Sequence, residues 1–228
     1  IRGTLENIPG ESLSDYDIVQ FTLAYFQEVV QQNKKKLVVL GRDARKSGSH
    51  IAQLVSKTLV NLGCDVVDLG LVTTPTLGIS TKKMKASGGI MISASHNDEK
   101  WNALKLLNNL GEFLSPKIVE LIINEKERKH IISEAKGSIT KYDKALQDHI
   151  NLILSQKEVL IDKIVNKIFK VIVDGINSVG GVAIPEFLSQ LGVDDIVRIN
   201  CEPSGNFAHN PEPLPEHLTQ ICDAMKKE

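Results

Sequence analysis

The chain has 228 residues, of which 42% are hydrophobic, so it is long enough to form one or two domains with a substantial core. Its 27 basic and 28 acidic side chains leave a net charge of −1, which does not favour nucleic acid or an anionic membrane surface as a partner. No apolar run approaches the roughly 18 residues that a membrane-spanning helix needs, and we expect no membrane partner.

Three cysteines, Cys64, Cys201 and Cys222, are odd in number and far apart in the sequence. This pattern predicts reduced thiols in a cytoplasmic protein rather than a disulfide framework, and without a close second ligand it argues against a metal site. The sequence opens at Ile1 without an initiator methionine and closes at Glu228 within a predicted helix. We therefore expect a fragment of a longer protein, whose oligomeric state cannot be read from this pattern.

Hydrophobic periodicity in the first part of the chain predicts alternating helices and strands. Apolar residues at helical spacing predict a helix over 14–33, with Ser14 as the N-cap and Asp17 in the capping-box position. Short continuous apolar runs are typical of buried strands. We predict strands at 37–41, 66–69 and 89–92, helices at 49–62 and from 115, a short helix that follows a loop at 73–76 and runs towards Lys83, and a hairpin that joins 103–107 to 113–114.

This alternation predicts an α/β fold, made of three-layer α/β/α domains with mixed, mainly parallel sheets. The pattern weakens between about 137 and 145, where we place the boundary between a first domain at 1–140 and a second at 141–228. The second domain is predicted to have helices at 143–154, 158–167, 179–191 and from 215, and strands at 169–175 and 195–199. Four prolines in residues 200–215 predict a long irregular loop, and such loops are often functional.

Residues 93–105 carry the clearest chemical signal in the sequence. A buried strand delivers the backbone to Ser93-Ala94-Ser95, at the sheet edge where open α/β folds bind ligands. Ser95 is a candidate nucleophile or phosphate carrier, although its hydroxyl needs activation. His96 is a candidate hydrogen-bond donor to phosphate, and Asn97 a candidate cap of the loop. The alternative is an ordinary Ser-x-Ser turn beside an exposed histidine.

Three cationic side chains are candidates for acid–base catalysis or phosphate binding near this serine. Lys105 returns past it on the hairpin strand, where nearby charges can tune a lysine as a general acid or base; the alternative is a solvated strand lysine. Arg42 ends the first strand and has the fork that suits phosphate binding, but pairing with Asp43 to hold the loop is an equal alternative. Arg2, beside Gly3, does not by itself indicate a functional role.

Two stretches in the second half are weaker candidates. Asn177 and Gly180-Gly181 follow a strand as a phosphate-cradling turn would, but the sequence has no Walker lysine or complete Gly-x-Gly-x-x-Gly. We interpret them as turn residues. His209-Asn210-Pro211-Glu212-Pro213 in the long loop could face a ligand, and a rigid loop ordered by proline is the interpretation we favour.

Four short motifs occur in order along the first half: Ile1-Arg2-Gly3, Gly41-Arg42-Asp43-x-Arg45, Ser93-Ala94-Ser95-His96-Asn97 and Asn102-x-x-Lys105. Together they resemble the α-D-phosphohexomutase family, which comprises phosphoglucomutases, phosphomannomutases and phosphoglucosamine mutases. Further on, Val173-Asp174-Gly175-x-Asn177 and the motif at 209–213 resemble landmarks of that family's second domain. The resemblance covers only the N-terminal part of such a protein.

The resemblance implies an isomerase that interconverts hexose or hexosamine 6-phosphate and 1-phosphate by intramolecular phosphoryl transfer. It implies that Ser95 is phosphorylated, gives its phosphoryl group to the sugar and takes back the other group from the bisphosphate. His96 and Lys105 match residues that act as acid and base or orient phosphate. Asn97 matches a loop contact, and Arg2 a contact to the serine phosphate. Positively charged side chains around the phosphoryl group would stabilise the charge on its oxygens in a loose transition state.

The resemblance also implies Mg²⁺ as the cofactor, bound to Ser95 through its phosphate, with aspartate ligands outside this chain. The family's Asp-x-Asp-x-Asp-Arg metal loop and its third and fourth domains do not occur in the sequence. We therefore predict that these residues alone do not isomerise a sugar phosphate. Which hexose phosphate is the substrate cannot be read here, because the sugar-selecting loop lies outside the chain.

Three residues at two places depart from the family's pattern. Asp98 and Glu99 stand where the family usually has proline, and Ala103 replaces the usual glycine before Lys105. These departures motivate an alternative function, a non-catalytic paralogue that binds sugar phosphate. A serine hydrolase is discounted, because the sequence has no Gly-x-Ser-x-Gly elbow.

Overall fold

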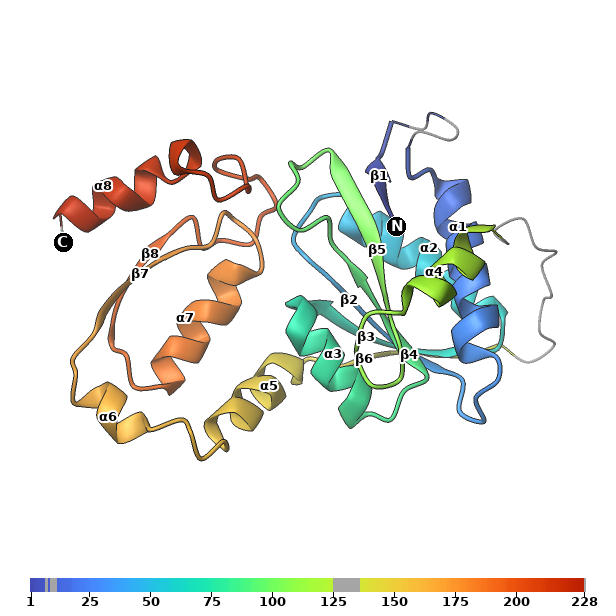
Figure 1. Cartoon of the computed structure of the whole chain (residues 1–228), viewed down its shortest axis with the longest axis horizontal. Helices are drawn as coiled ribbons and strands as arrows, with labels where there is room; N and C mark the ends of the chain where they lie inside the picture. The colour runs from blue at the N-terminus through green and yellow to red at the C-terminus, as the bar shows by residue number, and fades with distance from the viewer. Residues whose placement is uncertain (7, 9–11, 125–135, 228) are drawn as a thin grey trace.

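A computed structural model describes residues 1–6, 8, 12–124 and 136–227, and its main feature is a six-stranded sheet in the order β1-β5-β4-β2-β3-β6 (Figure 1). The strands β2, β3, β4 and β6 are parallel, whereas β5 is antiparallel to β4, and β1 is antiparallel to β5. This is a mixed, mainly parallel sheet. The strands are β1 (Arg2–Thr4), β2 (Leu37–Arg42), β3 (Asp65–Leu71), β4 (Gly88–Ile92), β5 (Trp101–Leu107) and β6 (Ile139–Lys141).

Helices cover both faces of this sheet, because side chains alternate between two hydrophobic clusters along its central strands. Val38 and Leu40 of β2 pack with α1 (Asp15–Tyr25), α2 (Gly48–Asn61) and α4 (Pro116–Asn124). Leu37 and Val39 pack on the other side with residues of α3 (Thr74–Lys83) and α5 (Ala145–Leu154). The first half is therefore a three-layer α/β/α unit, as the sequence predicts.

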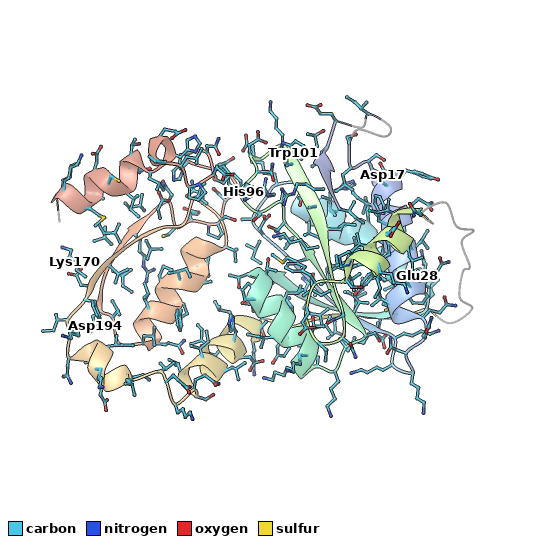
Figure 2. The ribbon with its side chains drawn as sticks, viewed as in Figure 1. Asp17, Glu28, His96, Trp101, Lys170 and Asp194 are labelled. Atoms are coloured by element: carbon cyan, nitrogen blue, oxygen red, sulfur yellow. The ribbon has the colours of Figure 1, made fainter. Side chains whose placement is uncertain are left out.

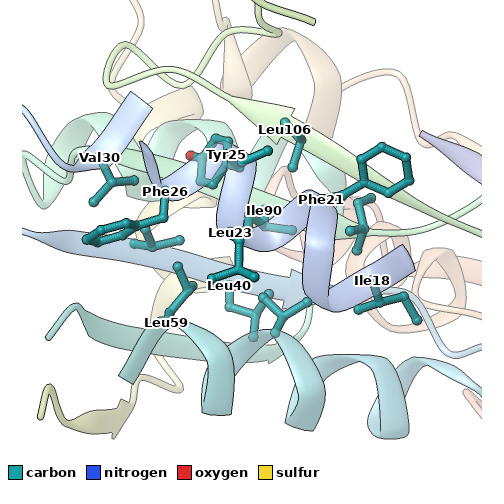
Figure 3. Close-up of a cluster of buried hydrophobic side chains, with 14 of the residues drawn as sticks. Ile18, Phe21, Leu23, Tyr25, Phe26, Val30, Leu40, Leu59, Ile90 and Leu106 are labelled. Carbon is teal, nitrogen blue, oxygen red and sulfur yellow. The ribbon is translucent and has the colours of Figure 1, made fainter. Parts of the chain in front are cut away.

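The larger of the two clusters is built around the first helix (Figure 3). The chain continues from α1 into a π-helical turn at Phe26–Val30, so that Leu23, Phe26 and Val30 all face the sheet. Leu59 of α2 meets them from the neighbouring helix. Burial of each such aliphatic side chain stabilises the fold by about 1.5–3 kcal/mol. The predicted capping box is present: Ser14 Oγ accepts from the Asp17 backbone, and Asp17 accepts from the Ser14 backbone.

The second sheet has two parallel strands, β7 (Lys170–Asp174) and β8 (Asp195–Ile199). Helix α7 (Gly180–Gln190) packs against both strands, and α8 (Thr219–Lys227) contacts β7. The short helices α6 (Ile161–Val165) and η2 (Pro215–His217) complete this half. No helix in the described ranges is both long and apolar enough to cross a membrane.

The structure differs from the predicted elements at several edges. The three-residue strands β1 and β6 are too short to leave a periodic pattern, and the sequence analysis missed both. The predicted hairpin partner at 113–114 is reduced to a single bridge between Phe113 and Leu107. Helix α6 is shorter than the predicted 158–167.

The region of the predicted domain boundary contributes to the first sheet. Strand β6 pairs in parallel with β3, and Ala145 of α5 is buried in a cluster with Leu77 of α3. The Thr76 hydroxyl lies 2.9 Å from Nδ1 of His149, which also joins α5 to α3. The division into 1–140 and 141–228 stays a prediction.

Candidate functional site

The predicted serine lies in the loop between β4 and β5, which we call the serine loop (residues 93–100). Asp43 of the loop after β2 donates its backbone N–H to Ile92 at the end of β4, so the two strand-end loops are adjacent. Ser95 is exposed and has a φ of +60°, which is uncommon outside glycine. Its backbone N–H donates to Ser93 Oγ at 3.2 Å. Such a backbone conformation persists only where its surroundings impose it.

Arg45 holds the serine loop in this shape, although the sequence analysis did not single it out. Its guanidinium is fully buried and all five of its N–H donors are used. Nε donates to Asp43 Oδ2 at 3.1 Å, and the other four donate to the backbone carbonyls of Ser95 (3.1 Å), Asn97 (2.6 Å), Asp98 and Trp101 (2.9 Å). The buried cation therefore fixes the loop from its first turn to its end.

Arg2 and Asn97 lie together at the serine loop. Arg2 is exposed on β1, and its Nη1 donates to Asn97 Oδ1 at 2.6 Å. Strand β1 brings the arginine there by pairing Arg2 with Ala103 of β5. Arg2, whose role the sequence alone does not indicate, thus brings a positive charge to Asn97 of the serine loop.

Lys105 is half-buried on β5, directly opposite Met91 of β4. Burial, the largest cause, lowers the pKa of Lys105 from its ordinary value. The positive charges of Arg2 and Arg45 act in the same direction, and the carboxylate of Asp43 opposes them. A lysine with a lowered pKa exchanges its proton more readily near neutral pH than a solvated strand lysine does.

His96 contacts the second half of the chain. Its Nε2 lies 3.3 Å from Glu212 Oε2, and both side chains are partly exposed. Figure 2 shows His96 between the two halves, with Trp101 on the side of the first sheet. The irregular loop at 200–215 therefore reaches the serine loop.

Within the described residues, no hydrogen bond or ion pair joins the Arg42 side chain to the serine loop. Its Nη1 donates to the backbone carbonyl of Asp43 at 3.4 Å, while the carboxylate of Asp43 pairs with Arg45. The alternative in which Arg42 and Asp43 pin the loop as an ion pair is therefore wrong. Arg42 lines a separate cavity of about 690 Å³ over α2, β3 and β6, and no serine-loop residue lines it. Its predicted role in phosphate binding stays a prediction.

The second-half motifs form turns and an ordered loop. His209 Nε2 lies 2.8 Å from Asp174 Oδ2, and its Nδ1 lies 2.9 Å from the carbonyl oxygen of Asn210. Burial, the largest single influence, lowers the pKa of His209, but these two hydrogen bonds outweigh it and the net pKa is raised. Asn177 has a φ of +53° and donates its side-chain N–H to the Asn206 carbonyl. Both observations agree with the interpretation as structural turns.

Within the described residues, no group of three or more histidine, cysteine, aspartate or glutamate side chains is placed to hold a metal ion. The fold and the site together define a class of protein: an α/β unit that presents one exposed serine at a strand end, among arginine and lysine side chains.

Comparison with protein families is consistent with this class. The family model described as phosphoglucomutase/phosphomannomutase, alpha/beta/alpha domain I matches residues 1–130. The model described as domain II of the same family matches residues 147–228. The chain belongs to the phosphoglucomutase/phosphomannomutase family.

Curated proteins with similar sequences carry names of the same family. A phosphoglucosamine mutase of Methanococcus aeolicus is 34% identical over 84% of this chain and 41% of its own length. A phosphoglucomutase/phosphomannomutase of Thermococcus kodakarensis is 31% identical over 97% of this chain and 49% of its own length. The chain thus spans less than half the length of these relatives.

Solved structures show the same fold. A protein of Thermus thermophilus, provisionally named a phosphomannomutase, aligns with a TM-score of 0.81 at 23% identity, over 99% of this chain and 50% of that one. A phosphoglucomutase/phosphomannomutase family protein of Burkholderia thailandensis aligns with a TM-score of 0.72 at 24% identity, over all of this chain and 48% of that one.

Proposed function

We propose that this chain is part of a phosphohexomutase, in which Ser95 carries a phosphoryl group between the 6- and 1-hydroxyls of a hexose or hexosamine. The supporting observation is that Ser95 is exposed at a strand end, where the buried Arg45 binds its backbone carbonyl and so fixes the loop that carries it. Family membership, through relatives named phosphoglucosamine mutase and phosphoglucomutase/phosphomannomutase, supports the same proposal.

The proposed reaction has two phosphoryl transfers. In the first, a sugar hydroxyl oxygen gives up its proton and attacks the phosphorus on Ser95, the phosphorus–Oγ bond breaks, Oγ takes up a proton to become a hydroxyl again, and the sugar becomes a bisphosphate. In the second, Ser95 Oγ attacks the other phosphorus of the bisphosphate, and the sugar oxygen that leaves takes up a proton. A loose phosphoryl transition state depends on placed positive charge more than on a strong nucleophile.

Three residues around the serine would bind phosphate, transfer a proton and orient phosphate. Arg2 is an exposed cation that contacts the loop through Asn97, and it would bind the serine phosphate. Lys105, whose pKa is lowered chiefly by burial, would move the proton of the attacking or leaving hydroxyl. His96 is partly exposed and would orient phosphate at the mouth of the site.

The proposed cofactor is Mg²⁺, and only part of its site can be matched to this chain. Once phosphorylated, Ser95 would offer one phosphate oxygen as a ligand, and Mg²⁺ is commonly held by phosphate together with one or two carboxylates. The described residues contain no group of three or more histidine, cysteine, aspartate or glutamate side chains placed to hold a metal ion, so the carboxylates are proposed to come from outside this chain. The bound ion would neutralise charge on the phosphoryl group, and no step above is derived through it.

The alternative, a non-catalytic paralogue, is motivated by the departures at Asp98 and Ala103. Asp98 accepts a hydrogen bond from the Lys100 backbone through its side chain, and its own carbonyl accepts from Arg45. Ala103 is 2% exposed within the regular pairing of β1 with β5. Both residues fit the loop and strand as they stand, so neither is a sign of a distorted site, and the experiment below decides between the two functions.

Phosphate uptake tests the proposal. The protein that contains this chain is incubated with a hexose 1,6-bisphosphate, and its intact mass is measured. We expect a gain of one phosphate in the wild type and none in Ser95→Ala, with Ser49→Ala, at an exposed serine of α2, as the matched control that retains uptake. Binding of the bisphosphate without any gain in mass would support the paralogue instead.

Several further assignments belong to the same proposal. We propose that the substrate is a phosphorylated hexose, and that these 228 residues alone do not turn it over. The cytoplasmic location is proposed from the cysteine pattern. It is supported by Cys64, Cys201 and Cys222, none of which forms a disulfide.

A further inference from the structure

Two side chains of the irregular loop at 200–215 reach the serine loop and its anchor. The ring centroid of Phe207 lies 4.9 Å from Cζ of Arg45. The Glu212 carboxylate lies 3.3 Å from His96. Phe207 therefore contacts the residue that fixes the shape of the serine loop, although it is 162 positions away from Arg45 in the sequence.

The loop at 200–215 approaches the backbone before Arg45 so closely that only glycine fits at one of its positions. Gly205 is buried with a φ of +74°, and a Cβ atom there would lie 2.0 Å from the carbonyl oxygen of Ala44. The Ala44 backbone N–H in turn donates to Ser178 Oγ at 3.4 Å. The two halves are thus in contact at the residue before Arg45, and only glycine fits on the side of the 200–215 loop.

Phe207 contacts the guanidinium group of Arg45, whose N–H groups are already engaged in hydrogen bonds. All five guanidinium N–H groups are used in the plane, so only the faces of the group remain for contact. An aromatic ring over such a face attracts the cation and excludes water. Exclusion of water also strengthens the hydrogen bonds from Arg45 to the loop carbonyls.

We propose that Phe207 is a positioning residue for Ser95, acting through Arg45. It transmits the position of the 200–215 loop to the serine loop, so that Ser95 is held for phosphoryl transfer only while this loop is in place. This inference rests on the proposed function, because the position of Ser95 matters to a reaction only if Ser95 carries the phosphoryl group.

The test separates the aromatic ring from apolar bulk. Phe207→Met and Phe207→Leu remove the ring, and Phe207→Trp restores an aromatic face. Phe169→Leu is the matched control, since Phe169 is 50% exposed elsewhere in the second half. Amide hydrogen exchange of residues 95–101 and the rate of phosphate uptake from a hexose 1,6-bisphosphate are measured for each protein.

We expect exchange of residues 95–101 to rise roughly tenfold in the two variants that lack the ring, the size of a partly desolvated cation–π contact. Their maximal uptake rate should fall by a similar factor while the half-saturating bisphosphate concentration changes little. Phe207→Trp and Phe169→Leu should both match the wild type. A purely structural role would lower overall stability without this pattern of loss and rescue.

Two outcomes overturn different claims. If exchange of residues 95–101 is unchanged in Phe207→Met and Phe207→Leu, Phe207 is not a positioning residue. If the wild type gains no phosphate, the proposed function fails, and the exchange measurement still decides whether Phe207 orders the loop. If either Phe207→Met or Phe207→Leu fails to fold, the remaining variant is compared with Phe207→Trp in the same two measurements.

Discussion

Replacement of Arg45 by methionine should destabilise the first α/β unit strongly. The substitution keeps much of the apolar bulk of the side chain and removes its buried charge. It leaves the Asp43 side chain, which is 8% exposed, without its ion-pair partner. It also removes the donor from four loop carbonyls, those of Ser95, Asn97, Asp98 and Trp101.

The size of the effect follows from these contacts. Removing one partner of a buried ion pair costs about 3–5 kcal/mol, because an uncompensated charge stays behind. Hydrogen bonds to a charged group contribute about 1.5–3 kcal/mol each, but the loop carbonyls can turn to water when Arg45 is lost, so these values do not add. We therefore expect a loss of about 3–5 kcal/mol in the free energy of unfolding.

Urea unfolding followed by tryptophan fluorescence measures this loss. Trp101 is the single tryptophan of the chain, and it begins β5 directly after the serine loop. Arg42→Met is the matched control, because Arg42 is partly exposed and makes only a long hydrogen bond to a backbone carbonyl. Surface changes of that kind cost about 0.5 kcal/mol or less. Equal losses in the two variants would refute the reasoning that the buried Arg45 organises the loop.

Two further predictions concern the second half. Gly205→Ala should weaken its contact with the first half, because the new Cβ meets the Ala44 carbonyl and the positive φ adds about 1–2 kcal/mol of strain; the urea midpoint should fall, and an unchanged midpoint would contradict this. For His209, the net pKa is raised above the ordinary 6.5, so the stability from its pair with Asp174 is complete below pH 6.5 and lost as the pH rises through the folded-state pKa. Asp174→Asn removes both contributions of the carboxylate, and burial then outweighs the remaining hydrogen bond to Asn210, so urea midpoints should no longer fall as the pH rises across that range; a fall that survives would assign the pH dependence to another group.

Local pattern was sufficient for most of the elements in the first half. The capping box at Ser14 and Asp17 needs only residues three positions apart, and the continuous apolar run of β2 reports a strand buried on both faces. The strand exit before Ser95 could be predicted for the same reason. The strands β1 and β6 could not, because three residues are too few to show a period and pairing with β5 and β3 alone defines them.

The candidate site was predicted only in part. Sequence motifs identified Ser95, His96, Asn97 and Lys105 as neighbours in one strand-loop-strand segment, where order in the chain implies proximity. The choice between Arg42 and Arg45 could not be made, because both follow the same strand and only the folded backbone shows which guanidinium is buried against Asp43.

The amino-acid sequence by itself determined the α/β layers and the position of the serine at a strand end, since these depend on hydrophobic period and on residues close along the chain. Tertiary structure decided what surrounds that serine. Arg2, Phe207 and Glu212 approach the serine loop from distant segments, and their contacts exist only after two sheets and a long loop have packed. Such contacts depend on loop closure and on exact backbone approach, as at Gly205, and neither leaves a periodic signal in the sequence.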